Sequence, residues 1–473
     1  MAYSTIDKSR NNFNTILWTG NGSLPRAITG VGFSPDLVWA KDRDTAYNPQ
    51  WHDSVRGIDE GAIYSNANNA NDTTYHMDSF DNDGFTMGTD LAAINENTKK
   101  IVAWNWLAGG KAPTQTYKVV VVSDSGNKYR FRNSTDTATF GSSAVTLDLQ
   151  EGGTYTFDVT DSTLNSHPFV IGTAANSSEY STGVTYKLDG VTKTYSQYTS
   201  GFSSATSRQL IITVAASAPA LYYWCSQHSG MGGAINTNAT TGSSNFDGAI
   251  QSRCHANTTT GCSIVKWTGS GSAQTVGHDL GQKPDIFFVK RLGSSTNWTV
   301  YTDAIDGSID YFTLNATNSK NDSGNPVATS TVFQKNDTNS EEVIAYCFAS
   351  KPGFSRISTY MGNGSSDGPM VYTGFKPSFV LYKGALGGNA VDNWEIQDNA
   401  RHTNSPGNPQ DESLYPNINN AEGQDVTDRM DFYANGFKMR TNGVDYNGDG
   451  QTYLYMAFGQ TLVGSNNIPA TAF

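Results

Sequence analysis

The stretch WTGNGSLPRAITGVGFSPDLVWAK (residues 18–41) returns twice in this chain, as WTGSGSAQTVGHDLGQKPDIFFVK (267–290) and as YMGNGSSDGPMVYTGFKPSFVLYK (360–383). A glycine near the start and the proline before the last apolar run are 15 positions apart in all three, at Gly20–Pro35, Gly269–Pro284 and Gly362–Pro377. Composition alone does not produce one spacing three times. The sequence therefore predicts three homologous copies of one unit.

The copies continue alike beyond this motif. An Asp-containing segment follows (WHDSVR at 51, WTVYTDAID at 298, WEIQDNAR at 394), and each copy closes on a run such as IVAWNW at 101, VIAYCF at 343 or YLYMAF at 453. Apolar and β-branched runs are separated by Gly, Asn, Asp and Pro, which indicates strands and turns, and no helical periodicity is sustained. A copy is too long for one rung of a solenoid, so each is predicted to be an independent β-sandwich in which the motif forms a hairpin.

The spacing of the copies indicates an insertion. Gly269 and Gly362 are 93 residues apart, whereas Gly20 and Gly269 are 249 residues apart. We therefore expect an all-β protein of four domains. They are repeat 1 with a short N-terminal arm (1–110), an inserted Greek-key sandwich (111–235, the inserted sandwich), repeat 2 with a leading linker (236–350) and repeat 3 (351–473).

Composition excludes several functions. The 473 residues are 16% charged and 12% aromatic, with 47 Gly and 15 Pro, which suits turn-rich sandwiches with aromatic cores rather than disorder. The net charge is −12 and no basic face is evident, so nucleic-acid binding is not expected. No run approaches the roughly 20 apolar residues of a membrane span, and the N-terminus does not resemble a signal peptide. We expect no membrane insertion and no secretion.

The inserted sandwich carries a set of metal ligands. His167 lies in NSHPF, and Cys225, His228 and Met231 follow in WCSQHSGMGG. A thiolate and two imidazoles with a weak thioether are the ligands of a trigonal copper site, and thioether is a poor zinc ligand. The sequence does not establish a cofactor, and copper bound by these four residues is the one candidate that it suggests.

These ligands, in type and order, resemble the cupredoxin family of Greek-key copper sandwiches. The resemblance implies that His167, Cys225, His228 and Met231 converge at one end of the sandwich. Pro168 departs from the family, which usually has a polar residue after the first histidine. The alternative is that the four residues remain only as the packing skeleton of a former copper site.

Three other motifs look functional, but no catalytic residue is predicted. Gly364-Ser-Ser-Asp-Gly368 fits the G-x-S-x-G pattern but occupies a tight turn instead of a strand-to-helix elbow. The loop beginning at Asp445 mimics a calcium loop but has Met456 where a bidentate glutamate is needed. Asp53 and Asp398 each precede an arginine by three residues, which indicates structural pairs.

The recurring tryptophans Trp51, Trp298 and Trp394 are expected in the core, with sugar stacking as the alternative. The four cysteines are expected to be free, with pairing of Cys254 and Cys262 left open.

The phrases TIDKSRNNFNT, FSPDLVWAKDR, NGFKMRT and TYLYMAF, together with YYWCSQHSGMGG, resemble repeated-domain structural proteins of marine tailed bacteriophages, notably cyanophage-like tail-fibre proteins. The resemblance runs from about Tyr3 to Leu462. It implies a non-enzymatic virion protein that is made in the host cytoplasm, oligomerises in the particle and contacts other virion proteins.

The sequence favours a surface-exposed tail-fibre or adhesion component that binds a host-cell glycan or protein. The variable segments 42–56, 291–306 and 384–401 are its predicted recognition loops. A capsid or tail decoration protein that binds only virion subunits is the alternative. A copper redox module or a surface depolymerase is the second alternative.

Overall fold

The computed structural model describes residue 6 and residues 8–110, 112–237, 241–387, 392–401, 408–424 and 429–461. The predicted all-β class is confirmed, since strands account for most of the regular structure in these residues. The helices among them are short: α1 (Tyr195–Gly201), α2 (Val444–Asn447) and the 3-10 turns η1 (Ser9–Asn11), η2 (Ile58–Glu60), η3 (Ala92–Ile94), η4 (Ser162–Leu164) and η5 (Phe202–Ser204). No helix of the described residues is long and apolar enough to cross a membrane.

Repeat 1 has a five-stranded sheet in the order β1-β8-β3-β4-β5 and a three-stranded sheet in the order β2-β7-β6. The strands are β1 (Phe13–Thr19), β2 (Arg26–Thr29), β3 (Leu37–Asp42), β4 (Gln50–Asp53), β5 (Ile63–Tyr64), β6 (Met77–Asp81), β7 (Gly84–Met87) and β8 (Lys100–Trp106).

Repeat 2 has a large sheet in the order β20-β21-β22-β29-β24-β25-β26-β27 and the pair β23-β28. The strands are β20 (Ser243–Asn245), β21 (Ser252–Asn257), β22 (Cys262–Thr268), β23 (Ala273–Gly277), β24 (Ile286–Arg291), β25 (Thr299–Thr302), β26 (Asp310–Thr313), β27 (Asn321–Asp322), β28 (Val332–Asn336) and β29 (Glu342–Phe348).

Repeat 3 has sheets in the orders β30-β38-β32-β33, β31-β37-β36 and β34-β35. The strands are β30 (Ser355–Met361), β31 (Met370–Tyr372), β32 (Phe375–Leu386), β33 (Glu395–Asp398), β34 (Glu412–Ser413), β35 (Gly423–Gln424), β36 (Met430–Tyr433), β37 (Gly436–Met439) and β38 (Thr452–Thr461).

The three large sheets share one strand arrangement. In each, the closing strand lies between the first strand and the strand that ends the motif, as β1-β8-β3, β22-β29-β24 and β30-β38-β32. Matching positions pair across these ladders: Trp39 with Trp104, Phe288 with Tyr346 and Leu381 with Met456. The prediction that each motif forms a hairpin is wrong, because β1 and β3 flank β8 instead of pairing with each other.

The Gly-x-Gly turn of each motif is held by the same contact. The second glycine has a positive φ in all three turns (Gly22 +69°, Gly271 +79°, Gly364 +64°), which side-chain-bearing residues rarely adopt. The amides of these glycines donate to the carbonyls of Asn95, Asp337 and Asn447, respectively.

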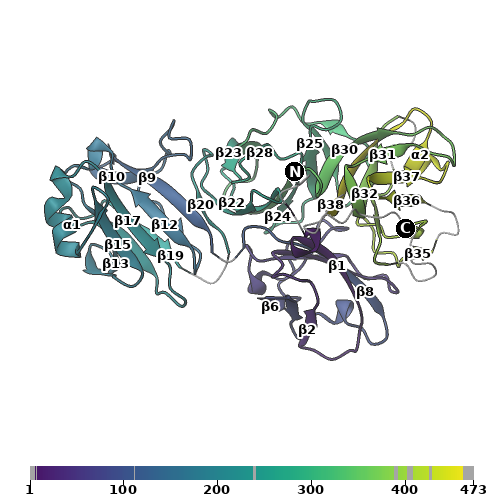
Figure 1. Ribbon diagram of the computed structural model, residues 1–473, viewed down its shortest axis with the longest axis horizontal. Coiled ribbons are helices and arrows are strands. Elements are labelled where there is room, and N and C mark those ends of the chain that lie inside the picture. Colours follow the sequence, from purple (N-terminus) through teal and green to yellow (C-terminus); the bar gives the residue numbers. More distant parts are fainter. Residues whose placement is uncertain are drawn as a thin grey trace.

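The repeats are not independent sandwiches, contrary to the prediction. One hydrophobic core contains Trp39 and Trp104 of repeat 1, Phe288 of repeat 2, and Phe379 and Leu381 of repeat 3. The outer faces of the large sheets therefore pack on one another, and the three repeats form one body at the right of Figure 1. This burial explains why all six residues of β3 are buried, whereas a sheet with one solvated face would alternate.

Buried polar groups cross the boundaries between repeats. The Tyr346 hydroxyl of repeat 2 donates to Asp53 Oδ2 of repeat 1 at 2.7 Å, and the Trp104 indole of repeat 1 donates to Asp398 Oδ2 of repeat 3 at 2.9 Å. At the third boundary, between repeats 3 and 2, the strand pairing puts Met456 at the position of the donor and Thr302 at the position of the aspartate. One polar contact thus recurs at two boundaries and is replaced by smaller or apolar groups at the third.

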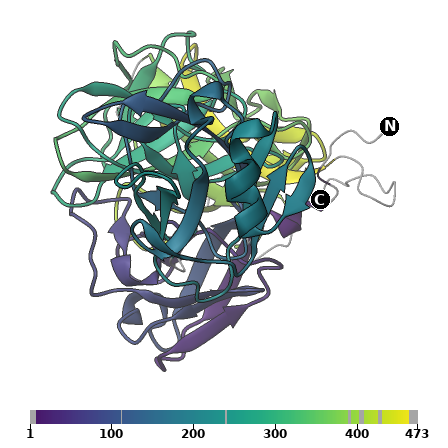
Figure 2. The same ribbon diagram turned by 90° about the vertical axis from the view of Figure 1, so that its left-hand side faces the viewer.

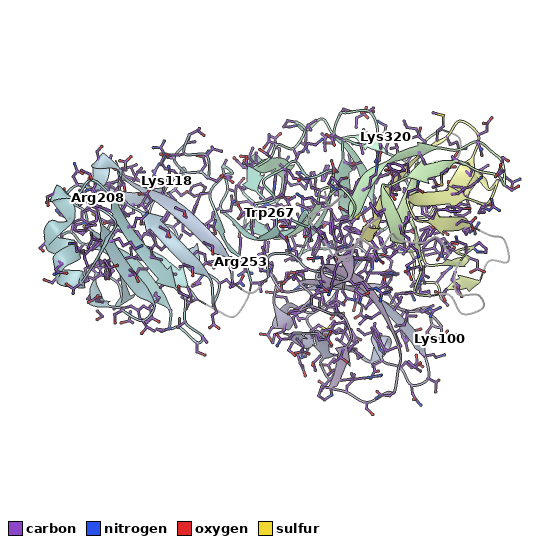
Figure 3. All side chains as sticks on the ribbon, in the orientation of Figure 1. Lys100, Lys118, Arg208, Arg253, Trp267 and Lys320 are labelled. Carbon is purple, nitrogen blue, oxygen red and sulfur yellow. The ribbon has the colours of Figure 1, made fainter. Side chains whose placement is uncertain are left out.

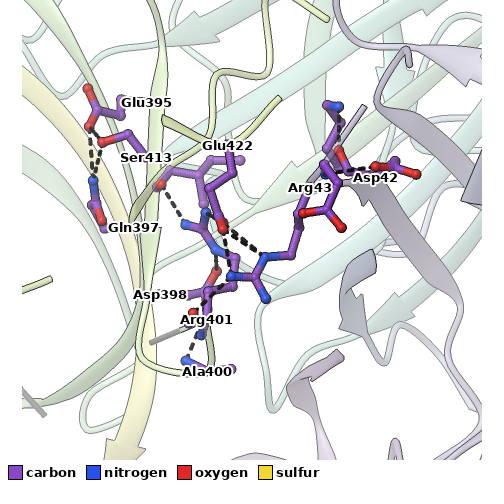
Figure 4. A network of polar contacts seen from close by, with 12 residues as sticks. Asp42, Arg43, Glu395, Gln397, Asp398, Ala400, Arg401, Ser413 and Glu422 are labelled. Carbon is purple, nitrogen blue, oxygen red and sulfur yellow. Dashed lines mark hydrogen bonds and ion pairs between the residues drawn. The ribbon is translucent and has the colours of Figure 1, made fainter. Parts of the chain in front are cut away.

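Figure 4 shows the network at the boundary between repeats 1 and 3. Glu422 accepts from Arg43 and, at 2.7 Å, from Arg401, whose Nε also donates to Asp398 at 2.5 Å. Arg43, Asp398 and Arg401 are all buried. Arg43 of the segment 42–56 and Asp398 and Arg401 of the segment 384–401 therefore lie between repeats, whereas residues 388–391 of the second segment lie outside the described residues.

The inserted sandwich projects from this body along the long axis of the molecule (Figures 1 and 2). Its two sheets have the orders β10-β9-β12-β17-β15-β16 and β11-β19-β18-β13-β14. The strands are β9 (Thr114–Ser123), β10 (Asn127–Phe131), β11 (Leu147–Asp148), β12 (Thr154–Asp158), β13 (Phe169–Ala174), β14 (Ser177–Glu179), β15 (Val184–Leu188), β16 (Val191–Lys193), β17 (Arg208–Thr213), β18 (Leu221–Cys225) and β19 (Ala234–Asn236).

The base of the inserted sandwich is fixed to repeat 2. Phe246, just after β20, belongs to the core of the inserted sandwich and stacks on Phe131 with ring centroids 4.7 Å apart. The Tyr117 hydroxyl donates to the Ser244 carbonyl at 2.8 Å. Strand β20 thus belongs to the large sheet of repeat 2 and also closes the base of the inserted sandwich.

Candidate metal centre

Two neighbouring strand ends bring the predicted ligands together. Strands β13 and β18 are antiparallel, with Phe169 opposite Cys225. His167 therefore lies just before β13 at the end of the sandwich where Cys225 ends β18. His228 follows in the loop after β18, so a histidine and a cysteine from adjacent strand ends meet a histidine from the loop between β18 and β19.

Three donor atoms face one another at this point. The Nδ1 atoms of His167 and His228 are 3.1 Å apart, and Cys225 Sγ lies 3.9 Å from the first and 3.6 Å from the second. Among the described residues, this cluster is one of two groups whose donor atoms lie close enough to hold a metal ion together. Two imidazoles and one thiolate are the equatorial ligands of a trigonal copper site, so the donor set fits copper.

The surroundings of the cluster favour the neutral imidazole of His167, which is the form that can bind a metal. Burial, followed by the nearby His228, lowers the pKa of His167, so its imidazole stays neutral. Cys225, His167 and Met231 are buried, whereas His228 is exposed to solvent. Met231, the predicted axial ligand, lies in the same hydrophobic core as Cys225.

Strand β10 of the opposite sheet holds both ligand segments. Asn127 Nδ2 lies 3.3 Å from His167 Nε2, and the Tyr129 hydroxyl donates to the His167 carbonyl at 2.9 Å. The Tyr129 amide donates to the Met231 carbonyl at 2.9 Å, and Lys128 Nζ donates to the Gly230 carbonyl. Three consecutive residues of one strand therefore fix the position of His167 and of the loop that carries His228 and Met231.

The cluster lies at the tip of the inserted sandwich, away from the repeats. Strand β9 begins at the base, where Gln115 donates to the Ser244 carbonyl of repeat 2 at 3.3 Å. Its ten residues span about 30 Å before the turn that leads to Asn127. The candidate site is therefore presented at the far end of the molecule (Figure 1).

The second donor cluster already holds a cation of the protein. Asp306, Asp310 and Asp322 of repeat 2 converge, but Lys320 Nζ lies 2.8–2.9 Å from all three carboxylates. Lys320 is labelled in Figure 3. Its ammonium neutralises the cluster and occupies the place of a metal ion.

The apparent calcium loop and the G-x-S-x-G motif form one structural unit. Asn447 is fully buried, and its amide donates to Asn363 Oδ1 at 3.0 Å and to the Ser365 carbonyl at 2.7 Å. Ser365 Oγ accepts from the Asp367 amide at 3.1 Å. These contacts brace the glycine turn of repeat 3 and provide no base for Ser365.

The tryptophans and cysteines are structural. Trp51, Trp298 and Trp394 are at most 1% exposed, so the sugar-stacking alternative is wrong for these three residues. The indoles of Trp298 and Trp394 donate to carbonyls of the preceding repeat, Tyr64 and Thr313. All four cysteines are free and buried, and Cys254 lies opposite Val265 instead of Cys262.

The structure adds residues that the motif search did not identify. Asn127 and Tyr129 lie about 40 positions before His167 in a segment without a ligand motif. The alternation Asn-Lys-Tyr-Arg-Phe at 127–131 was the only signal, because it places Asn127 and Tyr129 on one face of a strand.

The comparisons with known proteins identify a family without assigning a function. No curated protein and no solved structure matches this chain. A family model described as a domain of unknown function, DUF7483, matches residues 8–218 and 234–461. The match covers all three repeats and most of the inserted sandwich, and the chain therefore belongs to the DUF7483 family.

Proposed function

We propose that this protein is a non-enzymatic structural protein of a phage particle whose inserted sandwich holds one copper ion. The observation that carries the copper proposal is the convergence of His167 Nδ1, His228 Nδ1 and Cys225 Sγ within 3.9 Å of one another. These residues would hold the ion, and Met231 would add a weak thioether ligand. A copper ion in such a site supplies one-electron chemistry.

The chain's own residues would prepare this site before the metal arrives. The β10 contacts hold His167 and the 228–231 loop in place, and burial keeps the His167 imidazole neutral. Little rearrangement is then needed for binding, which supports a preformed site. Loading the purified protein with Cu(II) and recording the visible spectrum tests this part of the proposal.

The structural role is supported by the phage resemblance and by the construction of the body. A shared core joins the three repeats and the buried Arg43–Glu422 ion pair joins repeats 1 and 3, as expected for a rigid structural part of a particle. Mass spectrometry and immunogold labelling of intact particles test this role. Absence of the protein from purified particles would contradict it.

Two versions of the structural role differ in what the protein contacts. A tail-fibre or adhesion component would bind host cells through exposed loops, whereas a decoration protein would contact only other particle proteins. The burial of Arg43, Asp398 and Arg401 between repeats removes these charged groups from the loops predicted to recognise the host. This burial favours the decoration version. Binding of the isolated protein to host cells would instead support adhesion.

A further inference from the structure

A large cleft lies between repeat 1 and the inserted sandwich. Its volume is about 1220 Å³, and its walls come from the loop after β4, from β6 and from two turns of the inserted sandwich. Ser54 and Thr241 both line the cleft, and a 2.6 Å hydrogen bond joins their hydroxyls. The cleft is far from the candidate metal site, so the argument that follows is independent of copper.

The walls of the cleft carry an excess of carboxylates. Asp59 and Asp78 project from repeat 1 and Glu151 from the inserted sandwich, and Asp59 and Asp78 are exposed. Among the described residues that line the cleft, Arg56 is the only basic side chain, and it is buried and paired with Asp53 at 2.5 Å. A ligand that bears positive charge would therefore complement both walls.

Apolar side chains lie between these carboxylates. Ile58 is 38% exposed although it is a large aliphatic residue, and Phe80, Leu107 and Ala216 also line the cleft. The ligand that fits this surface carries apolar as well as cationic groups. A simple metal cation or a polyamine would leave the apolar part of the cleft uncovered.

The wall formed by β6 has an unpaired strand edge. The small sheet of repeat 1 has the order β2-β7-β6, so among the described strands β6 pairs only with β7. On its outer side, η2 lies close to β6 and Ser34 Oγ donates to the Phe80 carbonyl at 3.5 Å, so an added strand would have to replace that contact. Asp78, Ser79 and Phe80 of β6 all line the cleft. In Figure 1, β6 lies on the side of repeat 1 that faces the inserted sandwich. An extended polypeptide can add to such an edge through backbone hydrogen bonds.

We propose that this cleft receives an extended basic segment of another protein, which pairs with the outer edge of β6 and replaces the contact of Ser34 with the Phe80 carbonyl. Lysine or arginine side chains of the segment meet Asp59, Asp78 and Glu151, and its apolar side chains cover Ile58 and Phe80. This inference deepens the proposed structural role and rests on it for the identity of the partner as another particle protein.

Charge argues against the competing occupants. A second copy of this chain has a net charge of −12 and would meet an edge that carries Asp78 and Asp81. An anionic polysaccharide or a nucleic acid would be repelled by the same walls. A neutral oligosaccharide would gain nothing from the carboxylate excess beyond ordinary hydrogen bonds.

The test measures binding of a fluorescent eight-residue peptide of alternating lysine and valine to the full chain by anisotropy. A glutamate-valine peptide and a lysine-valine peptide methylated on alternate backbone amides serve as the matched ligands. We expect only the unmethylated basic peptide to bind, with affinity that falls as salt rises. The double variant Asp59→Asn/Asp78→Asn should bind it at least tenfold more weakly, whereas Asp449→Asn, an exposed carboxylate on repeat 3, should bind it as the unchanged protein does.

Four results would overturn the inference: equal binding of the glutamate peptide, equal binding of the methylated peptide, an equal loss in Asp449→Asn, or a neutral oligosaccharide competing with the peptide. Thermal unfolding of each variant identifies any loss caused by misfolding, and Ile58→Ser then provides a second probe of the same wall. Failure of the basic peptide to bind would also overturn the inference, and this outcome is separable from the structural role because it does not change whether the protein is found in particles.

Discussion

The Tyr346 hydroxyl donates a 2.7 Å hydrogen bond to Asp53 Oδ2, and this contact joins repeat 2 to a fully buried ion pair of repeat 1. The same carboxylate oxygen accepts from Arg56 Nε at 2.5 Å, and burial raises the pKa of Tyr346 well above its usual value. The tyrosine thus remains a neutral donor, and Asp53 keeps partners on both sides of the boundary.

Replacing Tyr346 by phenylalanine should destabilise the whole body. A hydrogen bond to a charged group contributes about 1.5–3 kcal/mol, so Tyr346→Phe should lower the free energy of unfolding by about that amount. Urea unfolding measures the change. Tyr311→Phe in the same repeat is the control and should change stability by less than about 0.5 kcal/mol. Equal effects of the two variants would show that the contact with Asp53 does not matter.

The shared core predicts that a single repeat is not a stable monomer. Residues 241–350 alone would expose Phe288, Trp298 and Tyr346, which are at most 1% exposed in the full chain. We expect this fragment to aggregate or to self-associate through that face, as measured by size-exclusion chromatography and circular dichroism. A monomeric fragment with cooperative unfolding would contradict the shared core.

Three equivalent lysines should make stability rise at alkaline pH. Lys41, Lys290 and Lys383 end the motif in their repeats and are at most 1% exposed, and burial lowers the pKa of each to about 8. In the unfolded chain their pKa is near 10.4. Below pH 8 these lysines are charged in both the folded and the unfolded protein, and the folded protein bears the cost of burying the charge. Above pH 8 the lysines lose their protons in the folded protein first, so the free energy of unfolding rises with pH. Above about pH 10 the buried tyrosines, which ionise more easily in the unfolded chain, oppose this rise.

Unfolding by urea at pH 7, 8, 9 and 9.5 measures this rise. Lys290→Met should show a smaller rise than the unchanged protein, because one of the three groups no longer titrates. Lys100→Met removes an exposed lysine (labelled in Figure 3) and should leave the rise unchanged. If stability does not change with pH, or if it rises equally in Lys290→Met, then burial does not lower the pKa of these lysines.

Asn127 should orient His167 for metal binding. When Nδ1 of His167 faces the metal, Nε2 carries the proton, and the Asn127 amide 3.3 Å away can present its oxygen as the acceptor. Asn127→Ala should weaken copper binding by about 10–100-fold in chelator competition, as expected for loss of such a partner. Asn127→Asp keeps an acceptor oxygen and should restore most of the affinity, whereas Asn236→Ala, at the end of strand β19, should have no effect. Copper affinity that is the same in Asn127→Ala and Asn236→Ala would remove this role.

The sequence predicts the β class, the order of the copies and the residues of the donor cluster at His167, Cys225 and His228 because these depend on local patterns. Strand runs, glycine turns and the Cys-x2-His-x2-Met spacing are all visible within short segments. The shared core is not local, yet it left one signal: the runs LVWA, IFFV and FVLY do not alternate, which is typical of a sheet covered on both faces.

Contacts between distant segments could not be predicted. Arg43 and Glu422 are far apart in the chain, and nothing near either residue indicates the other. The tryptophans show a related limit, because Trp51 lies opposite Trp39, whereas Trp298 comes before the matching position, Val300, which lies opposite Phe288. Similar local sequences therefore suggested that Trp51 and Trp298 are equivalent, whereas the pairing of the strands shows that they occupy different positions.

Copper loading of the purified full chain tests the central claim most directly. Titration with Cu(II) should saturate at one ion per chain and produce a strong visible absorption from the thiolate of Cys225. Cys225→Ala should lose that band, and His228→Ala should weaken binding, while both variants unfold at nearly the same temperature as the unchanged metal-free protein. No visible band, or a band of equal strength in Cys225→Ala, would contradict a copper site formed by His167, Cys225 and His228.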